Sequence, residues 1–229
     1  MYSAENADLK RGTAEDPVGL WLVDKPEGVS SFGVVARLRR VTGIKKVGHT
    51  GTLDPLATGL MVLLVGKDFT RLAQGLTKLD KVYEVTIQLG TTSTTDDEEG
   101  EKTQVSDHRP TLQEVQAVIQ GLTGTIEQTP PIYSAIKVGG QRAYKLARRG
   151  EQPKLLSRPV KVYEWANVEY AYPLLKATIV VGSGTYIRSL ARDLGEGLGT
   201  GAYMTALRRT RVGDFQIADA MTLDYLEKI

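Results

Sequence analysis

Residues 48–59 read GHTGTLDPLATG, and the apolar run LMVLLVG follows directly over residues 60–66. The first segment carries one histidine, His49, and one carboxylate, Asp54, among three glycines. Glycine allows a close backbone approach or a positive φ, and Pro55 disfavours a helical conformation at Asp54. The pattern predicts an ordered loop that presents Asp54 beside a buried strand. Taken alone, the segment fits a simple Asp-Pro turn better, so other residues must decide between the two interpretations.

The composition is that of a soluble globular protein, with 229 residues of which 41% are apolar and 24% are charged. There is no cysteine, which excludes disulfides, thiolate catalysis and cysteine metal sites. The histidines are His49 and His108 alone, so a zinc site is disfavoured as well. No apolar run is long enough to span a bilayer, and the N-terminus lacks an apolar signal segment. We therefore predict a cytoplasmic protein without membrane contact.

Basic side chains are clustered although the net charge is only +2. Residues 37–46 carry five basic and no acidic side chains, and residues 137–161 carry eight basic residues and one acid. A third cluster lies within residues 208–211, while residues 96–101, DDEEGE, are acidic. Clustered Lys and Arg can follow a phosphate backbone. The alternative is a set of solvated helix faces, and the charges alone leave both interpretations open.

Apolar periodicity predicts a mixed α+β fold with a mainly antiparallel sheet. Strands are expected over residues 18–24, 60–66, 81–90, 160–170, 174–184 and 203–215, and helices over residues 32–42, 67–76, 111–122, 141–150, 184–199 and 223–229. Ser31 is the expected cap of the first helix, and Thr111 with Glu114 forms an expected capping box. Residues 91–110 are polar and acidic, so we expect a long loop there.

Five segments in order resemble the TruB family of tRNA pseudouridine synthases: LVDKPEGVSS, GHTGTLDPLATGLMVLLVG, KVYEV, PPIYSAIKVGGQRAY and GTYIRSLARDLG. The resemblance runs from about residue 18 to residue 226. It implies a pseudouridine-synthase fold, a central mixed and mainly antiparallel sheet flanked by helices, with a catalytic cleft. It also implies that the T-loop uridine of tRNA, at position 55, is isomerised to pseudouridine. The reaction breaks the N1–C1′ bond, turns the base and rejoins it through C5. Because this isomerisation needs no redox change or energy input, no cofactor or metal is implied.

The resemblance implies catalytic roles for three residues. Asp54 is the implied nucleophile or base, and an ionised carboxylate suits either role. Attack at the sugar, attack at the base and proton abstraction all remain open. Arg188 is the implied partner of Asp54, because a guanidinium keeps a carboxylate ionised in a water-poor site. Tyr83 is implied to stack on the target base and to take part in proton removal at C5, whereas its strand position alone would suggest a core aromatic.

Substrate-binding roles are implied for four further residues: His49, Tyr186, Leu207 and Asp97. His49 would fill space near the flipped nucleotides, Tyr186 and Leu207 would line the uracil pocket, and Asp97 would contact neighbouring nucleotides. Each of the first three would otherwise be an ordinary loop or core residue. Residues 132–149 match a mobile insertion that closes over the RNA, with its basic side chains meeting phosphates.

Two departures from the family pattern are visible. Thr94 stands where the family usually has an aspartate, which bears on RNA contacts in the acidic loop. The sequence also ends at Ile229, where bacterial relatives usually continue into a small RNA-binding PUA domain. We accordingly expect a disordered tail over residues 1–16 and one catalytic domain over residues 17–229, working as a monomer. Either the protein lacks a PUA domain or this sequence is a shortened form of it.

Two alternative functions remain open from the sequence. One is an RNA-binding chaperone that folds tRNA, with chemistry incidental. The other is a related synthase that acts within a guide-RNA complex, as archaeal and eukaryotic relatives do.

Overall fold

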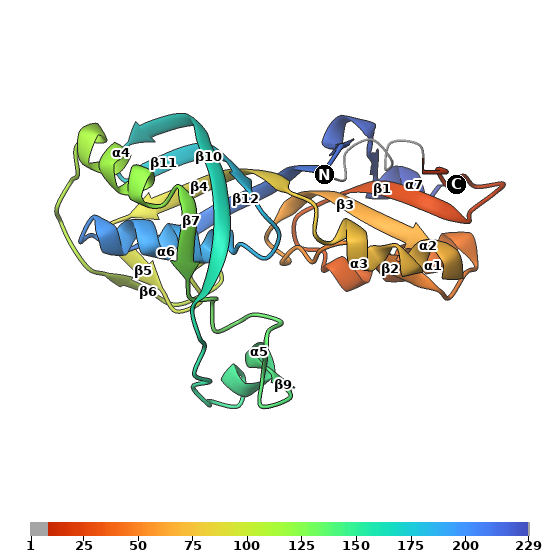
Figure 1. Ribbon diagram of the computed structural model, residues 1–229, viewed down its shortest axis with the longest axis horizontal. Coiled ribbons are helices and arrows are strands. Elements are labelled where there is room, and N and C mark those ends of the chain that lie inside the picture. Colours follow the sequence, from red (N-terminus) through yellow and green to blue (C-terminus); the bar gives the residue numbers. More distant parts are fainter. Residues whose placement is uncertain (1–8, 229) are drawn as a thin grey trace. The chain divides into compact units, whose positions relative to one another are not determined.

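The computed structural model describes residues 9–228 (Figure 1). It divides into two compact units, one containing the residues up to 84 and from 207 onward, the other containing residues 85–206. Two strands, β4 (Lys81–Leu89) and β12 (Ala202–Val212), continue from one unit into the other. A large and mostly antiparallel sheet with flanking helices confirms the predicted mixed fold class.

The sheet of the first unit has the strand order β14-β1-β3-β12. Strand β1 (Gly19–Lys25) is antiparallel to β3 (Thr58–Val65) and parallel to β14 (Met221–Thr222), while β3 and β12 are parallel. Two short strands, β2 (Val47–His49) and β13 (Phe215–Gln216), pair with β3 and β12. The helices of this unit are α1 (Ser31–Thr42), α2 (Lys67–Arg71), α3 (Ala73–Leu76), η1 (Ile217–Asp219) and α7 (Leu223–Leu226).

Strand β3 is the buried strand that the apolar run predicts. Every residue from Gly59 to Val65 is buried, which explains why the sequence is apolar without alternation. Side chains of β1 and β3 form a core with the β12–β13 turn, including Leu20, Leu60, Val62 and Phe215.

The tail predicted over residues 1–16 lies partly outside the described residues, which begin at residue 9. Residues 10–12 bond to the first strand, through Leu20 N–H to Lys10 O at 2.9 Å and Gly12 N–H to Leu20 O at 3.0 Å. Arg11 and Leu20 form a parallel bridge there. These residues extend the sheet of the first unit.

The second unit contains an antiparallel sheet in which β11 (Leu174–Val181) and β7 (Gly124–Gln128) flank the long strand β10 (Arg158–Ala171). Strand β4 follows β11 in the order and presents Val85, Ile87 and Leu89 to the core on alternate positions, as its sequence predicts. Two hairpins, β5 (Thr91–Ser93) with β6 (Lys102–Gln104) and β8 (Lys137–Val138) with β9 (Gln141–Arg142), complete the strands, and the helices are α4 (Leu112–Gly121), α5 (Ala143–Ala147) and α6 (Ile187–Gly197).

The expected capping box of α4 is confirmed. The Thr111 side chain accepts from the Glu114 backbone N–H at 3.3 Å, and the Glu114 carboxylate accepts from the Thr111 backbone N–H at 2.6 Å. The prediction succeeds because both partners lie within one turn of the same helix.

Three predicted elements were wrong in extent. Residues 91–110 contain the β5–β6 hairpin rather than a long loop; its strands are polar and lack the apolar alternation that reveals a strand. The helix over 67–76 is two short helices, and the helix over 141–150 shrinks to the five residues of α5.

Gly59 is required by the packing of β3 against β12. Its φ is +104°, and a Cβ built there would lie 2.3 Å from the Arg209 carbonyl oxygen. We expect Gly59→Ala to destabilise the protein by at least about 2 kcal/mol more than Gly28→Ala, because both strain the backbone but only the first meets backbone atoms. Gly28 has φ +78° and no heavy atom within 4 Å of the built Cβ. Urea unfolding of both variants checks this, and equal midpoints would contradict it.

Candidate active site

The Asp54 loop is tied to the start of helix α1. Ser30, rather than the predicted Ser31, caps this helix by accepting from the Gly33 N–H at 3.0 Å. The Ser31 hydroxyl is buried instead and bonds both the N–H and the carbonyl of Leu53, each at 2.8 Å. These two hydrogen bonds to the residue before Asp54 fix the loop. Ser31 therefore holds the loop and does not cap the helix, so its predicted role was wrong.

Lys25 supports the same loop from the end of β1. Its ammonium is fully buried and donates to the carbonyls of Pro26 at 2.9 Å, Val29 at 2.6 Å and Pro55 at 3.1 Å. Burial lowers the pKa of Lys25 to about 8, against the opposing effect of the nearby Asp54 carboxylate. The ammonium therefore joins two loop segments and places a positive charge near Asp54.

The backbone around Asp54 does form a turn, as the local interpretation suggests. The Ala57 N–H donates to the Asp54 carbonyl at 3.1 Å, and the Gly28 N–H donates to the Pro55 carbonyl at 2.9 Å. These bonds use main-chain atoms only, so the turn and a chemical role for the Asp54 carboxylate are compatible.

Arg209 anchors the other side of the loop. This arginine is 1% exposed, and its guanidinium donates to the carbonyls of Leu60 at 2.8 Å and Gly51 at 3.1 Å. Burial, and next the charge of Arg209, lower the pKa of His49, which is therefore neutral at pH 7. Within residues 9–228 the buried His49 Nδ1 has no hydrogen-bond partner. Burial followed by Arg209 likewise lowers the pKa of Lys81 to about 8.

Two other predicted residues of the first unit lie on its strands. Tyr83 on β4 is 7% exposed, and Leu207 on β12 is partly buried. The Thr58 hydroxyl approaches the Leu207 carbonyl at 3.5 Å, and Arg208 next to it pairs with Asp24 through two nitrogens at 2.7 and 3.1 Å.

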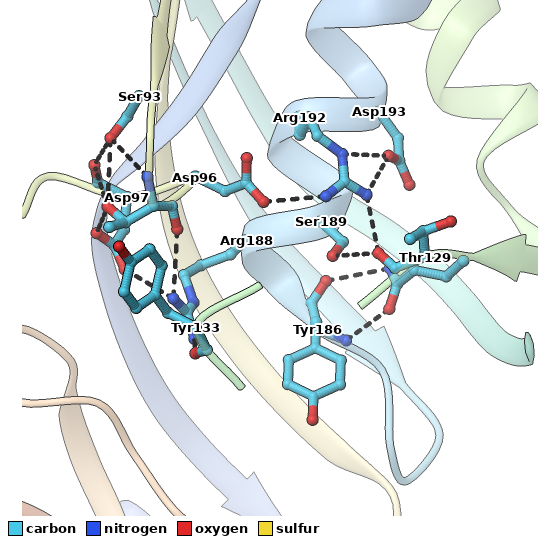
Figure 2. A network of polar contacts seen from close by, with 12 residues as sticks. Ser93, Asp96, Asp97, Thr129, Tyr133, Tyr186, Arg188, Ser189, Arg192 and Asp193 are labelled. Carbon is cyan, nitrogen blue, oxygen red and sulfur yellow. Dashed lines mark hydrogen bonds and ion pairs between the residues drawn. The ribbon is translucent and has the colours of Figure 1, made fainter. Parts of the chain in front are cut away.

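In the second unit, helix α6 carries Arg188 into a polar network (Figure 2). The guanidinium pairs with the Asp97 carboxylate at 3.1 Å and donates to the carbonyls of Thr95 at 3.3 Å and Tyr133 at 2.8 Å. The side chains of Arg188 and Asp97 are only 7% and 2% exposed. Arg188 thus connects the acidic loop with the first residues of the insertion.

Asp97 is itself fixed by the acidic loop. Its carboxylate accepts from the Thr95 hydroxyl and from the Glu99 N–H at 3.0 Å. Thr94, which replaces the family's usual aspartate, closes this loop by accepting from the Glu101 N–H at 3.1 Å. Nucleotide contact by Asp97 stays a prediction. The buried ion pair with Arg188 shows that Asp97 holds the Arg188 guanidinium.

Tyr186 is held just before α6 begins. The Gln128 side chain accepts from the Tyr186 N–H at 2.8 Å and donates to the Tyr186 carbonyl at 3.1 Å. The Arg158 guanidinium lies over the Tyr186 ring, 5.4 Å from its centroid. Sequence reasoning missed Gln128 and Arg158, since nothing in their local patterns links them to a residue 58 or 28 positions away.

The predicted site residues fall into two groups. Asp54, His49, Tyr83 and Leu207 belong to the first unit, and Arg188, Asp97 and Tyr186 belong to the second. The pairing of Asp54 with Arg188 joins the two groups and stays a prediction. Among residues 9–228 there is no group of three or more His, Cys, Asp and Glu side chains that could hold a metal ion. In the same range no helix is long and apolar enough to cross a membrane.

Comparison with known proteins identifies the family. Residues 39–187 match the model of the TruB family pseudouridylate synthase N-terminal domain, and residues 188–229 match that of the tRNA pseudouridylate synthase B C-terminal domain. The chain is 50% identical over 218 residues to tRNA pseudouridine synthase B of Thermobifida fusca, covering 91% of this chain and 74% of that protein. It is 46% identical over 212 residues to the Opitutus terrae protein of the same name, covering 92% and 88%.

Solved structures show the same fold at greater distance. A crystal structure of a Cbf5–Nop10–Gar1 complex matches with 28% identity and a TM-score of 0.70, covering 98% of this chain and 61% of that chain. An archaeal box H/ACA sRNP Nop10–Cbf5 complex matches with 26% identity and a TM-score of 0.67, covering 99% and 60%. The chain therefore spans about three fifths of these structures' chains, and the fold, the two family models and the curated relatives agree: the chain belongs to the TruB family of pseudouridine synthases, which are isomerases.

Proposed function

We propose that this protein isomerises a uridine of tRNA to pseudouridine, and that the target is the T-loop uridine at position 55. The observation that carries the proposal is the identity of 46–50% over more than nine tenths of the chain to proteins named tRNA pseudouridine synthase B. The protein would act as a monomer in the cytoplasm, on the T-stem-loop.

Asp54 is the proposed reacting group. Its loop is held by Ser31, Lys25 and Arg209 through backbone atoms, which leaves its carboxylate on a fixed turn. The carboxylate serves as nucleophile or base while the N1–C1′ bond of the uridine breaks and the base rejoins through C5. C5 then loses its proton and N1 gains one, so the reaction is a balanced isomerisation. The target base must first leave its stack, at a cost of about a few kcal/mol.

The remaining predicted residues take supporting roles in this proposal. Arg188 pairs with Asp54 and keeps it ionised, and Tyr83 stacks on the extruded base. His49, neutral at pH 7, fills space beside the flipped nucleotides, and Tyr186 with Leu207 lines the uracil pocket.

The decisive experiment incubates the purified chain with unmodified tRNA and maps pseudouridine at single-nucleotide resolution. We expect one new pseudouridine, at position 55. A tRNA with cytidine at that position is the matched control and should gain none. Product elsewhere would overturn the target, and no product with any tRNA would overturn the activity.

A second candidate is suggested by the structural neighbours. Cbf5 is solved in complexes with Nop10 and Gar1, one of the related structures being an H/ACA RNP bound to a substrate RNA. This chain could act in a comparable RNA–protein assembly. Activity of the purified chain on a bare T-arm hairpin would exclude that requirement, and activity only with an added guide RNA would support it.

We expect tRNA binding to weaken steeply with salt. The eight basic residues within 137–161 are suited to phosphate contacts, and each contact releases counterions. With about six such contacts, affinity should fall roughly a thousandfold between 50 and 200 mM salt. Filter binding measures the slope. Lys145→Gln and Arg142→Gln should each reduce it by about one, whereas Lys10→Gln, paired with Asp16, should leave it unchanged. A flat salt dependence would contradict the phosphate role.

A further inference from the structure

Arg192 lies one helical turn after Arg188 on α6 (Figure 2), and a spacing of four residues makes the two positions neighbours along the helix. Its guanidinium pairs with Asp96 at 3.0 Å and with Asp193 at 2.9 Å, and it donates to the Thr129 carbonyl at 2.9 Å. All three side chains are largely buried, being 17 to 22% exposed. Arg192 is therefore a second guanidinium that connects α6 with the acidic loop.

Asp96 occupies an unusual backbone position. Its φ is +61°, in the left-handed region that costs a non-glycine residue about 1 kcal/mol. Two main-chain bonds hold it, from its own N–H to Ser93 O and from the Met204 N–H to its carbonyl, each at 3.1 Å. The ion pair with Arg192 is the side-chain contact that completes this arrangement. Because Asp97 is the next residue, the backbone conformation of Asp96 sets the position from which the Asp97 carboxylate meets Arg188.

Arg192 also reaches the base of the insertion. The Thr129 carbonyl accepts from Arg192 and from the Ser189 hydroxyl, the latter at 2.8 Å. Four residues later, the Tyr133 carbonyl accepts from Arg188 at 2.8 Å. Two arginines one turn apart thus fasten the same two segments, the acidic loop and residues 129–133, to helix α6.

The electrostatic effects within this network oppose one another. Burial raises the pKa values of Asp96 and Asp193 despite the opposing charge of Arg192. A carboxylate whose folded pKa is raised contributes stability below its unfolded pKa and loses it as pH rises through the folded pKa. Burial opposes the charge of Arg192 as well, but the charges of Asp96 and Asp193 outweigh it and raise the pKa of Arg192, which favours the ionised pair. The geometry, in which Arg192 fastens Asp96 and Thr129 to α6, therefore carries the argument for a conformational role.

We propose that Arg192 is a positioning residue, which holds Asp96 and Thr129 on α6 and thereby keeps Asp97 against the guanidinium of Arg188. This inference rests on the proposed function, since it assigns Arg192 to the support of Arg188 in that reaction. It extends beyond the residues implied by the family resemblance, none of which is Arg192, Asp96 or Asp193.

The test compares Arg192→Gln with wild-type protein in steady-state pseudouridine formation at saturating tRNA, which gives kcat. We expect kcat to fall about tenfold or more, because small displacements of a catalytic group are costly, while the Kd for tRNA changes less than twofold. Arg192→Lys should recover part of the rate, since lysine keeps the positive charge but cannot donate to all three acceptors of the guanidinium. Glu196→Gln is the matched control: Glu196 lies 3.8 Å from Arg192 and is 69% exposed, so kcat should not change.

A double-mutant cycle shows whether Arg192 acts through Asp96. Asp96→Asn keeps the shape and tolerates positive φ, so it removes the charge without new backbone strain. Its effect on kcat should be strongly non-additive with that of Arg192→Gln. Additive effects, or an Arg192→Gln rate within twofold of wild type, would overturn the proposal.

Hydrogen exchange separates this inference from the proposed function, because it needs no RNA. In Arg192→Gln, the amides of residues 94–101 should exchange faster than in wild type or in Glu196→Gln, while those of helix α4 should not change. Unchanged exchange over residues 94–101 would overturn the positioning role even if activity fell. If the wild-type protein formed no pseudouridine, the proposed function would fail and the exchange result would still decide this point.

Discussion

Asp54→Asn is expected to abolish pseudouridine formation, lowering the single-turnover rate by at least about a thousandfold. The substitution keeps the shape of the side chain and removes its negative charge, and with it the ability to act as nucleophile or base. None of the three proposed mechanisms at the sugar, at the base or by proton abstraction survives that change.

The fold should tolerate Asp54→Asn because the loop is held by other atoms. The Ala57 N–H bonds the Asp54 carbonyl, and the Ser31 hydroxyl bonds the Leu53 backbone. Lys25 donates to the Pro55 carbonyl rather than depending on the carboxylate alone. We therefore expect tRNA binding within about threefold of wild type and a similar melting temperature, which filter binding and calorimetry would measure.

The same variant discriminates between synthase and chaperone. If folding tRNA is the main activity, Asp54→Asn should refold tRNA as well as wild type does. Asp16→Asn, an exposed carboxylate paired with Lys10, is the control and should keep full synthase activity. Intact pseudouridine formation by Asp54→Asn would remove Asp54 from the chemistry.

Arg188→Lys is expected to lose most activity, about a hundredfold, while the protein still folds. Two guanidinium nitrogens serve three acceptors, namely the Asp97 carboxylate and the carbonyls of Thr95 and Tyr133. A lysine keeps the positive charge but presents one nitrogen, so it cannot reproduce a planar fork. The proposed contact with Asp54 would lose its geometry even though a cation remains.

Asp97→Asn tests the ion pair between Arg188 and Asp97 by changing its carboxylate. It takes a negative charge away from a buried guanidinium, so we expect both slower turnover and a loss of stability of about 3 kcal/mol. Arg71→Lys, at an exposed arginine paired with Asp68, is the matched control for arginine replacement and should turn over normally. Unchanged turnover in Arg188→Lys would refute the role of the guanidinium.

Much of the fold could be predicted from the sequence because its signals are local. The apolar run over residues 60–66 indicates a strand buried on both faces, and β3 is that strand. Alternation in β4 and the capping box at Thr111 depend on neighbours within a few positions. The β5–β6 hairpin was missed because its strands are polar and carry no apolar pattern.

Sequence patterns were enough to indicate the family, the buried strand beside the Asp54 loop and the candidate site residues. The contacts of those residues follow from the three-dimensional packing. Ser31 bonds Leu53 across 22 positions, and Arg188 pairs with Asp97 across 91. The physical reason is that periodicity and capping act within one element, whereas these bonds form between elements that packing of the whole chain brings together.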